Sequence, residues 1–353
     1  MEAIKEKIPV AVLGATGAVG QRFVQLLARH PWFRISALAA SKRSAGRSYQ
    51  ESCAWLMDTP LPKEAAELVV RPAKPDLEAA IVFSALPAEL ARQIEPRFAA
   101  AGYMVCSNSS AFRMEPDVPL IIPEVNADHV RMLEKQKKKR GWAGCLVTSP
   151  NCTTTGVALA LKPIDDAFGL RKVIAVSMQA VSGAGYPGLP YLDIQDNVIP
   201  YIAGEEEKIE RESLLLLGKM WGGSRVAADF HISAHANRVP VSDGHTVCLS
   251  LELESKPSVS QVLEKLRTFR GAGIESTLPT LPAVPLVVTE EADRPQPRRD
   301  RGAGNGMQVS VGRVRACPVL DIRLVTCVHN TLRGAAGGAM LNAELLAAQG
   351  YLD

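Results

Sequence analysis

The stretch Ile8-Pro-Val-Ala-Val-Leu-Gly-Ala-Thr-Gly-Ala-Val-Gly20 decides the fold of this chain. Residues 8–13 are a continuous apolar run typical of a buried strand, and a glycine-rich turn follows at once. Residues 17–30 carry apolar side chains at helical spacing, and residues 35–40 again favour a strand. The order strand, helix, strand predicts a βαβ unit and therefore a parallel sheet covered by helices.

The turn of this unit contains Gly14, Gly17 and Gly20. Glycine at a strand-to-helix turn lets the backbone approach a pyrophosphate, and the N-terminus of the helix attracts the anion. The spacing Gly-x-x-Gly-x-x-Gly also suits a plain tight turn, so the flanking strand and helix carry the interpretation. We expect a dinucleotide to contact this turn at Gly14, Thr16, Gly17, Ala18 and Val19.

A second cofactor signal follows the second predicted strand, in Ser41-Lys-Arg-Ser-Ala-Gly-Arg47. Sites that prefer NAD usually place an acidic residue here for the ribose hydroxyls. This stretch has hydroxyls and cations instead, which suit a 2′-phosphate. We predict NADP as the cofactor, with contacts from Ser41, Arg43 and Ser44; a basic loop that faces solvent is the alternative.

The same alternation of strands and helices continues to about residue 150. It predicts strands at 80–87, 103–107, 120–123 and 145–149, and helices at 88–101 and 127–140. We therefore predict an α/β fold that begins with a Rossmann-like, doubly wound NADP-binding domain over residues 1–150.

Beyond residue 172 the strands become longer and alternate in polarity, at 173–181, 245–254 and 319–328. Such alternation indicates a mostly antiparallel sheet with one solvated face, so residues 151–330 are predicted to form a second, α+β domain. The proline-rich segment 278–301 predicts an extended surface excursion. An Ala/Leu-rich helix is predicted after residue 331, and Gly334, Gly337 and Gly338 predict a close approach to another surface.

Composition narrows the class of protein. A length of 353 residues favours two domains, and 40 Lys and Arg against 37 Asp and Glu leave a net charge of +3. With 47% hydrophobic residues, this balance argues against disorder and against a dedicated nucleic-acid binder. The basic run Lys135–Arg140 is typical of the solvated end of an amphipathic helix.

Seven scattered cysteines without a Cys-x-x-Cys pair predict reduced thiols, a cytoplasmic location and no metal site. The charged first residues do not resemble a signal peptide. The uncharged stretches 141–161 and 173–192 contain many polar residues, so we expect no membrane span.

Cys152 is the one cysteine in an activating context. It precedes Thr153-Thr-Thr-Gly-Val-Ala-Leu-Ala-Leu161, which predicts the start of a helix, where the partial positive charge favours a thiolate. The other cysteines lie mostly in apolar strands, as Cys248 and Cys327 do, and a buried inert thiol is the default there. We therefore expect Cys152 to be a nucleophile.

A thiolate nucleophile needs a base nearby, and His245 is the best of six histidines. It opens a predicted strand after a glycine-containing turn, whereas His30 and His129 lie on helices predicted to be at the surface. Arg238, seven residues before His245, offers a planar fork for a carboxylate.

Seven ordered segments now show a resemblance over essentially the full length. The chain resembles the aspartate-semialdehyde dehydrogenases of the archaeal and fungal type. The segments are Gly14-Ala-Thr-Gly-Ala-Val-Gly-Gln-Arg-Phe, Ser41-Lys-Arg-Ser-Ala-Gly, Pro150-Asn-Cys-Thr-Thr-Thr-Gly, Met178-Gln-Ala-Val-Ser-Gly-Ala-Gly-Tyr-Pro-Gly, Gly204-Glu-Glu-Glu-Lys-Ile-Glu, Asn237-Arg-Val-Pro-Val-Ser-Asp-Gly-His-Thr and His329-Asn-Thr-Leu-Arg-Gly-Ala-Ala-Gly-Gly.

The resemblance implies roles for individual residues. Cys152 would be the nucleophile, His245 the acid and base, and Gln179 a residue that orients the acyl group. For substrate binding it implies Asn151, Arg238 for the carboxylate, Lys208 and Arg113 for the phosphate, and Glu205 for the ammonium, with Glu206 and Glu207 as alternatives to Glu205. For the cofactor we expect further contacts at Ser84, Leu86, Ser182, Gly183 and Asn330.

The resemblance also implies that residues 331–353 return to the first domain, and that residues 151–330 form a homodimer or homotetramer. The implied reaction is NADP-dependent reduction of L-aspartyl 4-phosphate to L-aspartate 4-semialdehyde through a thioester on Cys152, in lysine, threonine and methionine biosynthesis. Two alternatives stay open: a malonyl-CoA or other short acyl-CoA reductase on the same scaffold, and a non-catalytic regulator that senses NADP. Neither nucleic acid nor a membrane is expected as a partner.

Overall fold

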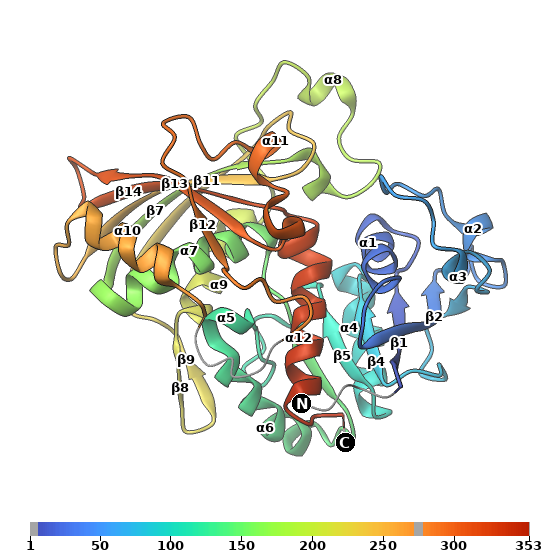
Figure 1. Cartoon of the computed structure of the whole chain (residues 1–353). Coiled ribbons are helices and arrows are strands. Elements are labelled where there is room, and N and C mark those ends of the chain that lie inside the picture. Colours follow the sequence, from blue (N-terminus) through green and yellow to red (C-terminus); the bar gives the residue numbers. More distant parts are fainter. Residues whose placement is uncertain (1–5, 272–277, 353) are drawn as a thin grey trace.

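The structure is a computed structural model that describes residues 6–271 and 278–352. Its first part is built on a six-stranded parallel sheet in the order β3-β2-β1-β4-β5-β6 (Figure 1). The strands are β1 Ile8–Leu13, β2 Phe33–Ala40, β3 Arg71–Pro72, β4 Ile81–Ser84, β5 Met104–Ser107 and β6 Cys145–Thr148. Every residue of β4, β5 and β6 is buried, as expected for a sheet covered on both faces.

Helices cover both faces of this sheet. Side chains of α1 and α12 share one apolar cluster with the strands, and those of α4 share another on the opposite face. The helices of this part are α1 Ala18–Leu27, α2 Tyr49–Ser52, α3 Lys63–Ala66, α4 Ala88–Ala100, η1 Ser110–Phe112, α5 Pro123–Asn126, η2 Ala127–Arg131 and α6 Met132–Arg140.

The second sheet has the order β10-β7-β11-β14-β13-β12. Its strands are β7 Leu170–Gln179, β10 His231–Arg238, β11 His245–Leu253, β12 Leu286–Val288, β13 Val309–Ala316 and β14 Ile322–Val328, and a separate hairpin consists of β8 Lys219–Trp221 and β9 Ser224–Val226. Three of the five pairings are antiparallel, whereas β10 with β7 and β12 with β13 are parallel.

One face of the second sheet is covered by the long helix α7, which runs over Cys152–Phe168 and whose apolar side chains join the sheet's core. Ile174 and Cys248 are exposed on the opposite face. The remaining helices are η3 Val181–Ala184, α8 Tyr191–Ile194, α9 Glu205–Leu216, α10 Val259–Thr268, α11 Pro297–Asp300, η4 Ala303–Gly306, the π-helical turn η5 Leu332–Ala336 and α12 Gly337–Ala348.

The C-terminal helix α12 lies against the first sheet (Figure 1). Met340 and Leu341 of α12 belong to the same apolar cluster as Val10 and Phe83. The glycines that lead into α12 lie close to other groups, as predicted, because a Cβ on Gly334 would stand 2.6 Å from the Cβ of Cys152. This contact joins the end of the chain to the start of α7.

Some sequence predictions about elements were wrong. Residues 120–123 form only an isolated bridge, from Leu120 to Thr148, and Pro123 begins α5. The Asn126 side chain accepts a hydrogen bond from Ile122 N and donates one to Leu120 O. These two backbone groups are therefore not available to pair with a neighbouring strand. Strands β10 and β13 were not predicted, and α6 is shorter than the predicted helix.

Three predicted environments also differ. His30 and His129 are buried rather than at the surface, because the ring of His30 pairs with the buried carboxylate of Glu344 and that of His129 contacts Asn126. Cys248 is exposed, because it points to the open face of the second sheet.

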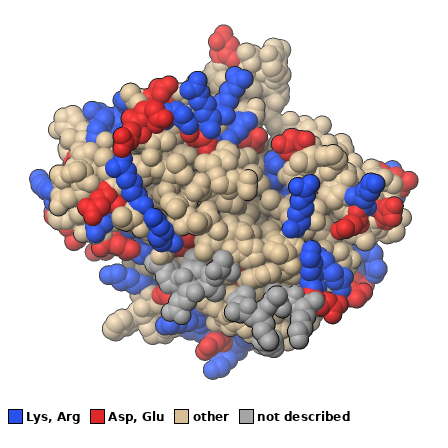
Figure 2. Space-filling model, in the orientation of Figure 1, with Lys and Arg blue, Asp and Glu red and all other residues tan. Residues whose placement is uncertain are grey.

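Two cations at the basic end of α6 are paired with carboxylates. Lys139 and Arg140 form ion pairs with Asp117, and Arg140 also pairs with Glu115. Positive and negative side chains are interspersed over the face shown in Figure 2. Within residues 6–271 and 278–352, no helix is both long and apolar enough to cross a membrane.

Candidate active site

Cys152 is the first residue of α7, and it faces His245 at the start of β11. The distance from Cys152 Sγ to His245 Nε2 is 3.2 Å. Asn151 caps the helix, because its Oδ1 accepts hydrogen bonds from the backbone N–H groups of Thr153 and Thr154 at 2.9 and 3.1 Å. The cap and the helix thus hold the sulfur beside the imidazole.

The tautomer of His245 follows from its second contact. The backbone N–H of Ala180 donates to Nδ1 of His245 at 3.0 Å. Nδ1 is therefore an acceptor, and a neutral imidazole carries its proton on Nε2, facing the sulfur of Cys152. In this state His245 can donate a hydrogen bond to a thiolate, or to an oxygen that becomes negative during reaction.

Burial dominates the protonation of this pair. It raises the pKa of the Cys152 thiol to about 12, with a further rise from the Glu205 carboxylate, while Arg113 acts in the opposite direction. Burial likewise lowers the pKa of His245 to about 3, and the charge of Arg238 adds to that fall. Both shifts favour the neutral forms, a thiol beside a neutral imidazole, and the desolvation of Cys152 acts against the thiolate that the helix N-terminus favours.

This protonation state predicts the pH dependence of alkylation. Labelling of Cys152 by iodoacetamide should rise by about tenfold per pH unit from pH 7 to 9 without a plateau, since the thiolate is the reactive form. Cys317 is an internal reference, because hydrogen bonding from the Leu320 backbone lowers its pKa. Peptide mass spectrometry measures both sites, and a plateau for Cys152 below pH 8 would show that its thiolate is already formed.

A cavity of about 640 Å³ opens at Cys152, between the two sheets, whereas His245 is buried and does not line it. Charged groups of both signs line it, namely Arg113, Glu205 and Lys208. Lys208 Nζ lies 3.3 Å from Glu205 Oε1, and Glu205 also accepts a hydrogen bond from the side-chain amide of Asn151 at 2.8 Å. The cavity can therefore receive a small substrate that carries an anionic and a cationic group.

Two sequence-predicted residues lie just behind the cavity wall. Arg238, at the end of β10, is buried and donates to the Ala180 carbonyl at 2.7 Å. Gln179, at the end of β7, does not line the cavity, and its amide donates to Ser177 Oγ at 3.2 Å. Of the three consecutive glutamates, Glu205 reaches the cavity, whereas Glu206 accepts a hydrogen bond from the Ala236 backbone.

The other end of the cavity meets the N-terminus of α1. Ala18 and Val19 line it, and Gly17 caps α1 without a side-chain hydrogen bond. The first backbone N–H groups of α1 therefore suit a phosphate anion. Gly14 has φ +73°, and a Cβ there would lie 2.7 Å from the Ala85 carbonyl oxygen, so this turn requires glycine.

The remaining predicted cofactor residues surround the same edge. Ser41, Arg43 and Ser44 form the turn after β2, and Ser84 ends β4, followed closely by Leu86. Asn330 connects two other segments, because it donates to Ser182 Oγ at 2.8 Å and accepts from Gly244 N at 2.9 Å. A Cβ on Gly183 would stand 2.7 Å from a guanidinium nitrogen of Arg238 and 3.1 Å from Cε1 of His245, so Gly183 packs closely on both side chains. These residues fit a dinucleotide laid across the edge of the first sheet.

The turn after β2 allows a test of the cofactor. Replacing Arg43 by alanine should raise the Michaelis constant for NADP by about tenfold or more and leave that for NAD nearly unchanged, since one charge-assisted contact to the 2′-phosphate is lost. Steady-state kinetics with both dinucleotides measures this. Arg29→Ala, at the far end of α1, is the control with the same change in charge, and an equal effect of both variants would contradict the assignment.

Sequence reasoning missed Glu212 as a residue of the site, and it predicted a close approach at Gly334 without identifying Cys152 as the neighbour. Glu212 is buried on α9 and contacts Arg113 and Asn151, while Gly334 packs on Cys152. Glu212 lies seven residues after Glu205, which places both on one face of a helix, and this spacing was the available signal. Nothing in the sequence near Gly334 points to Cys152.

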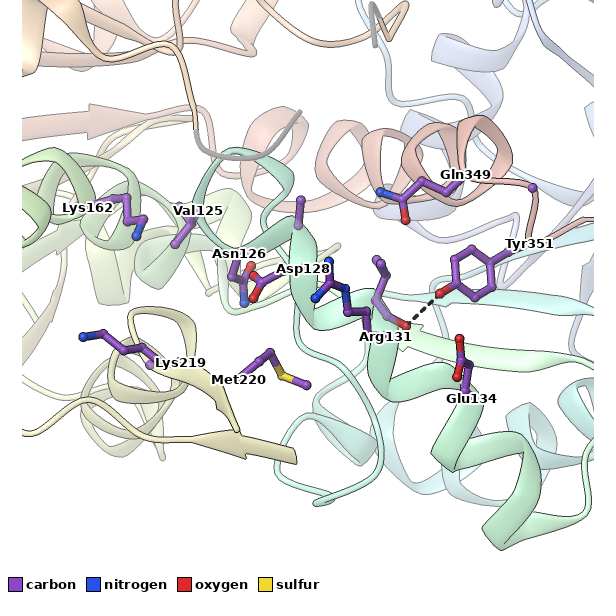
Figure 3. Close-up of a pocket in the computed structure, with 14 residues that line it drawn as sticks. Val125, Asn126, Asp128, Arg131, Glu134, Lys162, Lys219, Met220, Gln349 and Tyr351 are labelled. Carbon is purple, nitrogen blue, oxygen red and sulfur yellow. Dashed lines mark hydrogen bonds between the residues drawn. The ribbon is translucent and has the colours of Figure 1, made fainter. Parts of the chain in front are cut away.

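A larger cavity, of about 930 Å³, lies between the α5–α6 region and the C-terminus (Figure 3). Lys162, Lys219, Asp128 and Tyr351 are among its lining residues, with no cysteine or histidine among those described. The described residues also contain no cluster of three or more metal-ligating side chains. The smaller cavity is therefore the candidate active site, because it is lined by Cys152 and by charged side chains such as Arg113 and Glu205.

Comparison with known proteins matches both parts of the chain. Residues 9–133 match the family model "Semialdehyde dehydrogenase, NAD binding domain", and residues 161–333 match "Semialdehyde dehydrogenase, dimerisation domain". The aspartate-semialdehyde dehydrogenase of Archaeoglobus fulgidus is 51% identical over 96% of this chain and 97% of its own length. That of Saccharomyces cerevisiae is 41% identical over 97% and 98%.

Solved structures agree. The crystal structure of aspartate semialdehyde dehydrogenase with NADP from Candida albicans superposes with a TM-score of 0.90, at 41% identity over 98% of this chain and all of that one. The chain combines a parallel sheet of the dinucleotide-binding kind, a second mixed sheet and a cysteine–histidine pair between them. With the two matching family models, these features place it in the class of semialdehyde dehydrogenases. Within that class, the chain belongs to the aspartate-semialdehyde dehydrogenase family.

Proposed function

We propose that this protein reduces L-aspartyl 4-phosphate to L-aspartate 4-semialdehyde with NADPH and releases phosphate, and that it catalyses the reverse, phosphorylating oxidation. The observation that carries the proposal is the 3.2 Å contact of Cys152 Sγ with His245 Nε2 at a cavity that also contains Arg113, Glu205 and Lys208. A nucleophile, a proton donor and groups for both signs of charge are thus within one site.

Cys152 and His245 would divide the covalent steps. The Cys152 thiol gives up its proton, which leaves with the departing phosphate, and the resulting thiolate attacks the acyl carbon; the C–S bond forms and the C–O bond to the phosphate breaks, so that phosphate leaves with the bonding electrons. When bound, NADPH supplies the hydride that reduces the acyl group. His245 Nε2–H donates a hydrogen bond to the oxygen that becomes negative, and the C–S bond then breaks to give the aldehyde and the thiolate.

The charged residues would recognise the ends of the substrate. Arg238 would hold the α-carboxylate, Glu205 the ammonium, and Lys208 with Arg113 the phosphate. The Glu205 carboxylate within the cavity favours an ammonium. Arg238 is a buried guanidinium whose pKa is lowered by burial and raised by the charge of Glu205. The acyl group would be oriented by Gln179 after its amide leaves Ser177.

NADP is proposed as the cofactor. Its pyrophosphate would lie on the N-terminus of α1, at Ala18 and Val19, and its 2′-phosphate at Arg43. The structure of the Candida albicans relative with NADP supports this choice. We further propose a role in lysine, threonine and methionine biosynthesis. We also propose a cytoplasmic location, which the seven free cysteines support.

The experiment that tests the proposal is an assay of phosphate-dependent NADP reduction with aspartate semialdehyde. We expect turnover that requires both inorganic phosphate and NADP. Absence of this activity, together with NADPH oxidation by malonyl-CoA, would reassign the chain to an acyl-CoA reductase. The similarity to the aspartate-semialdehyde dehydrogenases of Archaeoglobus fulgidus and Saccharomyces cerevisiae supports the semialdehyde dehydrogenase over the acyl-CoA reductase.

We also propose a homodimer formed through the open face of the second sheet, with a homotetramer as its extension. The match to a dimerisation domain supports this, as do the exposed side chains of Ile174 and Cys248 on that face. Sedimentation equilibrium tests it, because a monomer mass would contradict the proposal.

A further inference from the structure

Glu212 makes two contacts that none of the proposed roles uses. It lies on the inner face of α9, two turns after Glu205, and its side chain is 2% exposed. One oxygen, Oε1, accepts from Arg113 Nη1 at 2.9 Å, and the other, Oε2, accepts from the backbone N–H of Asn151 at 2.6 Å. A single buried carboxylate thus joins a residue proposed to bind phosphate to the residue that precedes the nucleophile.

Asn151 is held in place through both its backbone and its side chain, and the contact with Glu212 is one of these hydrogen bonds. Its backbone N–H donates to Glu212, its side-chain amide donates to Glu205, and its Oδ1 accepts from the backbone of Thr153 and Thr154. Cys152 follows directly in the chain. The position of its sulfur therefore depends on α9, through two carboxylates seven residues apart.

The contact with Arg113 has an electrostatic consequence. Arg113 lines the cavity, and its positive charge lowers the pKa of Cys152 against the effect of burial. Glu212 is its ion-pair partner, and the Asn108 carbonyl accepts from its Nη2 at 2.8 Å. Without Glu212, the guanidinium would remain in place beside the cavity with its charge unpaired.

We infer that Glu212 is a positioning residue, which holds the Arg113 guanidinium and the backbone before Cys152 in one rigid unit and neutralises that guanidinium in the free protein. The inference rests on the proposed function, because it assigns Glu212 to the alignment of thiolate and phosphate. Glu212 itself does not line the cavity and would touch neither substrate nor cofactor.

The variant Glu212→Gln separates alignment from charge. A carboxamide has one acceptor oxygen, but both neighbours of Glu212 donate, so one of the two contacts is lost. We expect kcat of the phosphate-dependent reaction to fall by about tenfold or more, because the sulfur is no longer aligned. We expect iodoacetamide labelling of Cys152 at pH 8 to become faster by about threefold or more, because the unpaired Arg113 charge favours the thiolate.

The two opposite changes distinguish this role from a merely structural one. A loosened site would slow turnover without speeding alkylation, and that result would overturn the inference, as would a kcat within about twofold of wild type. Glu264→Gln is the matched control, because Glu264 is exposed on α10, outside the cavity, and undergoes the same charge change. It should leave both rates unchanged.

Two further measurements keep the test decisive. If Glu212→Gln does not fold, the double variant Arg113→Gln/Glu212→Gln is compared with Arg113→Gln. Cys152 of the double variant should be alkylated faster, because the buried carboxylate that would lack its arginine partner has been removed. Equal alkylation rates would overturn the inference. Wild-type activity is measured first. An inactive wild type refutes the proposed function, whereas an active wild type with an unaffected Glu212→Gln refutes only the role of Glu212.

Discussion

Replacement of Cys152 by alanine should lower the phosphate-dependent rate on the order of 10⁴-fold or more, with the fold intact. The sulfur is the only group at the start of α7 that can form the thioester, and the neighbouring His245 cannot substitute for it. The variant removes one atom from a cavity wall, so the NADP affinity and the thermal midpoint should stay close to wild type. Steady-state assay, NADP titration and calorimetry measure the three quantities.

The control for this variant is Cys317→Ser. Cys317 is partly exposed on the second sheet, outside the cavity, and its replacement should leave the rate within about twofold of wild type. Retention of more than a hundredth of the wild-type rate by Cys152→Ala, or an equal loss in the control, would remove Cys152 from the reaction.

Replacement of His245 by alanine should lower kcat on the order of 10²- to 10⁴-fold, which is less than the loss of Cys152. The imidazole is fixed by Ala180 N–H on one nitrogen and faces the sulfur with the other, so its loss removes the donor for the thiolate and for the developing oxyanion. The thiol remains, and a residual rate should therefore persist and increase with pH.

Steady-state kinetics from pH 6 to 10 checks this prediction. His235→Ala is the control, because His235 is exposed on β10, the edge strand of the same sheet. An unchanged kcat in His245→Ala, or a pH dependence that falls with rising pH, would contradict the assignment of the proton donor to His245.

Local patterns were sufficient for the first sheet. Its strands β1, β2, β4, β5 and β6 and the helices α1 and α4 agree with prediction within a few residues, whereas the short helices α2, α3 and α5 were not predicted. A buried parallel strand is a continuous apolar run, and a glycine-rich turn between such a strand and a helix is typical of a dinucleotide site. Prediction failed at residues 120–123, because a side chain, that of Asn126, replaces the strand neighbour there.

The second sheet was harder to predict for a related reason. Strands β10 and β13 were missed, and the parallel pairings of β10 with β7 and of β12 with β13 were not foreseen. The pairing of β10 with β7 joins segments more than fifty residues apart, and no local pattern encodes which neighbour a strand takes.

The sequence by itself determined the class of the fold, the dinucleotide turn and the choice of Cys152 among seven cysteines, because each depends on residues that are adjacent in the chain. Only the tertiary structure decided the rest of the site. It showed that burial shifts the pKa values of Cys152 and His245 toward their neutral forms, that Ala180 fixes the imidazole, and that Glu212 joins Arg113 to Asn151. These contacts join residues 61 to 99 positions apart, and desolvation depends on what surrounds a group in space, which the sequence around it does not contain.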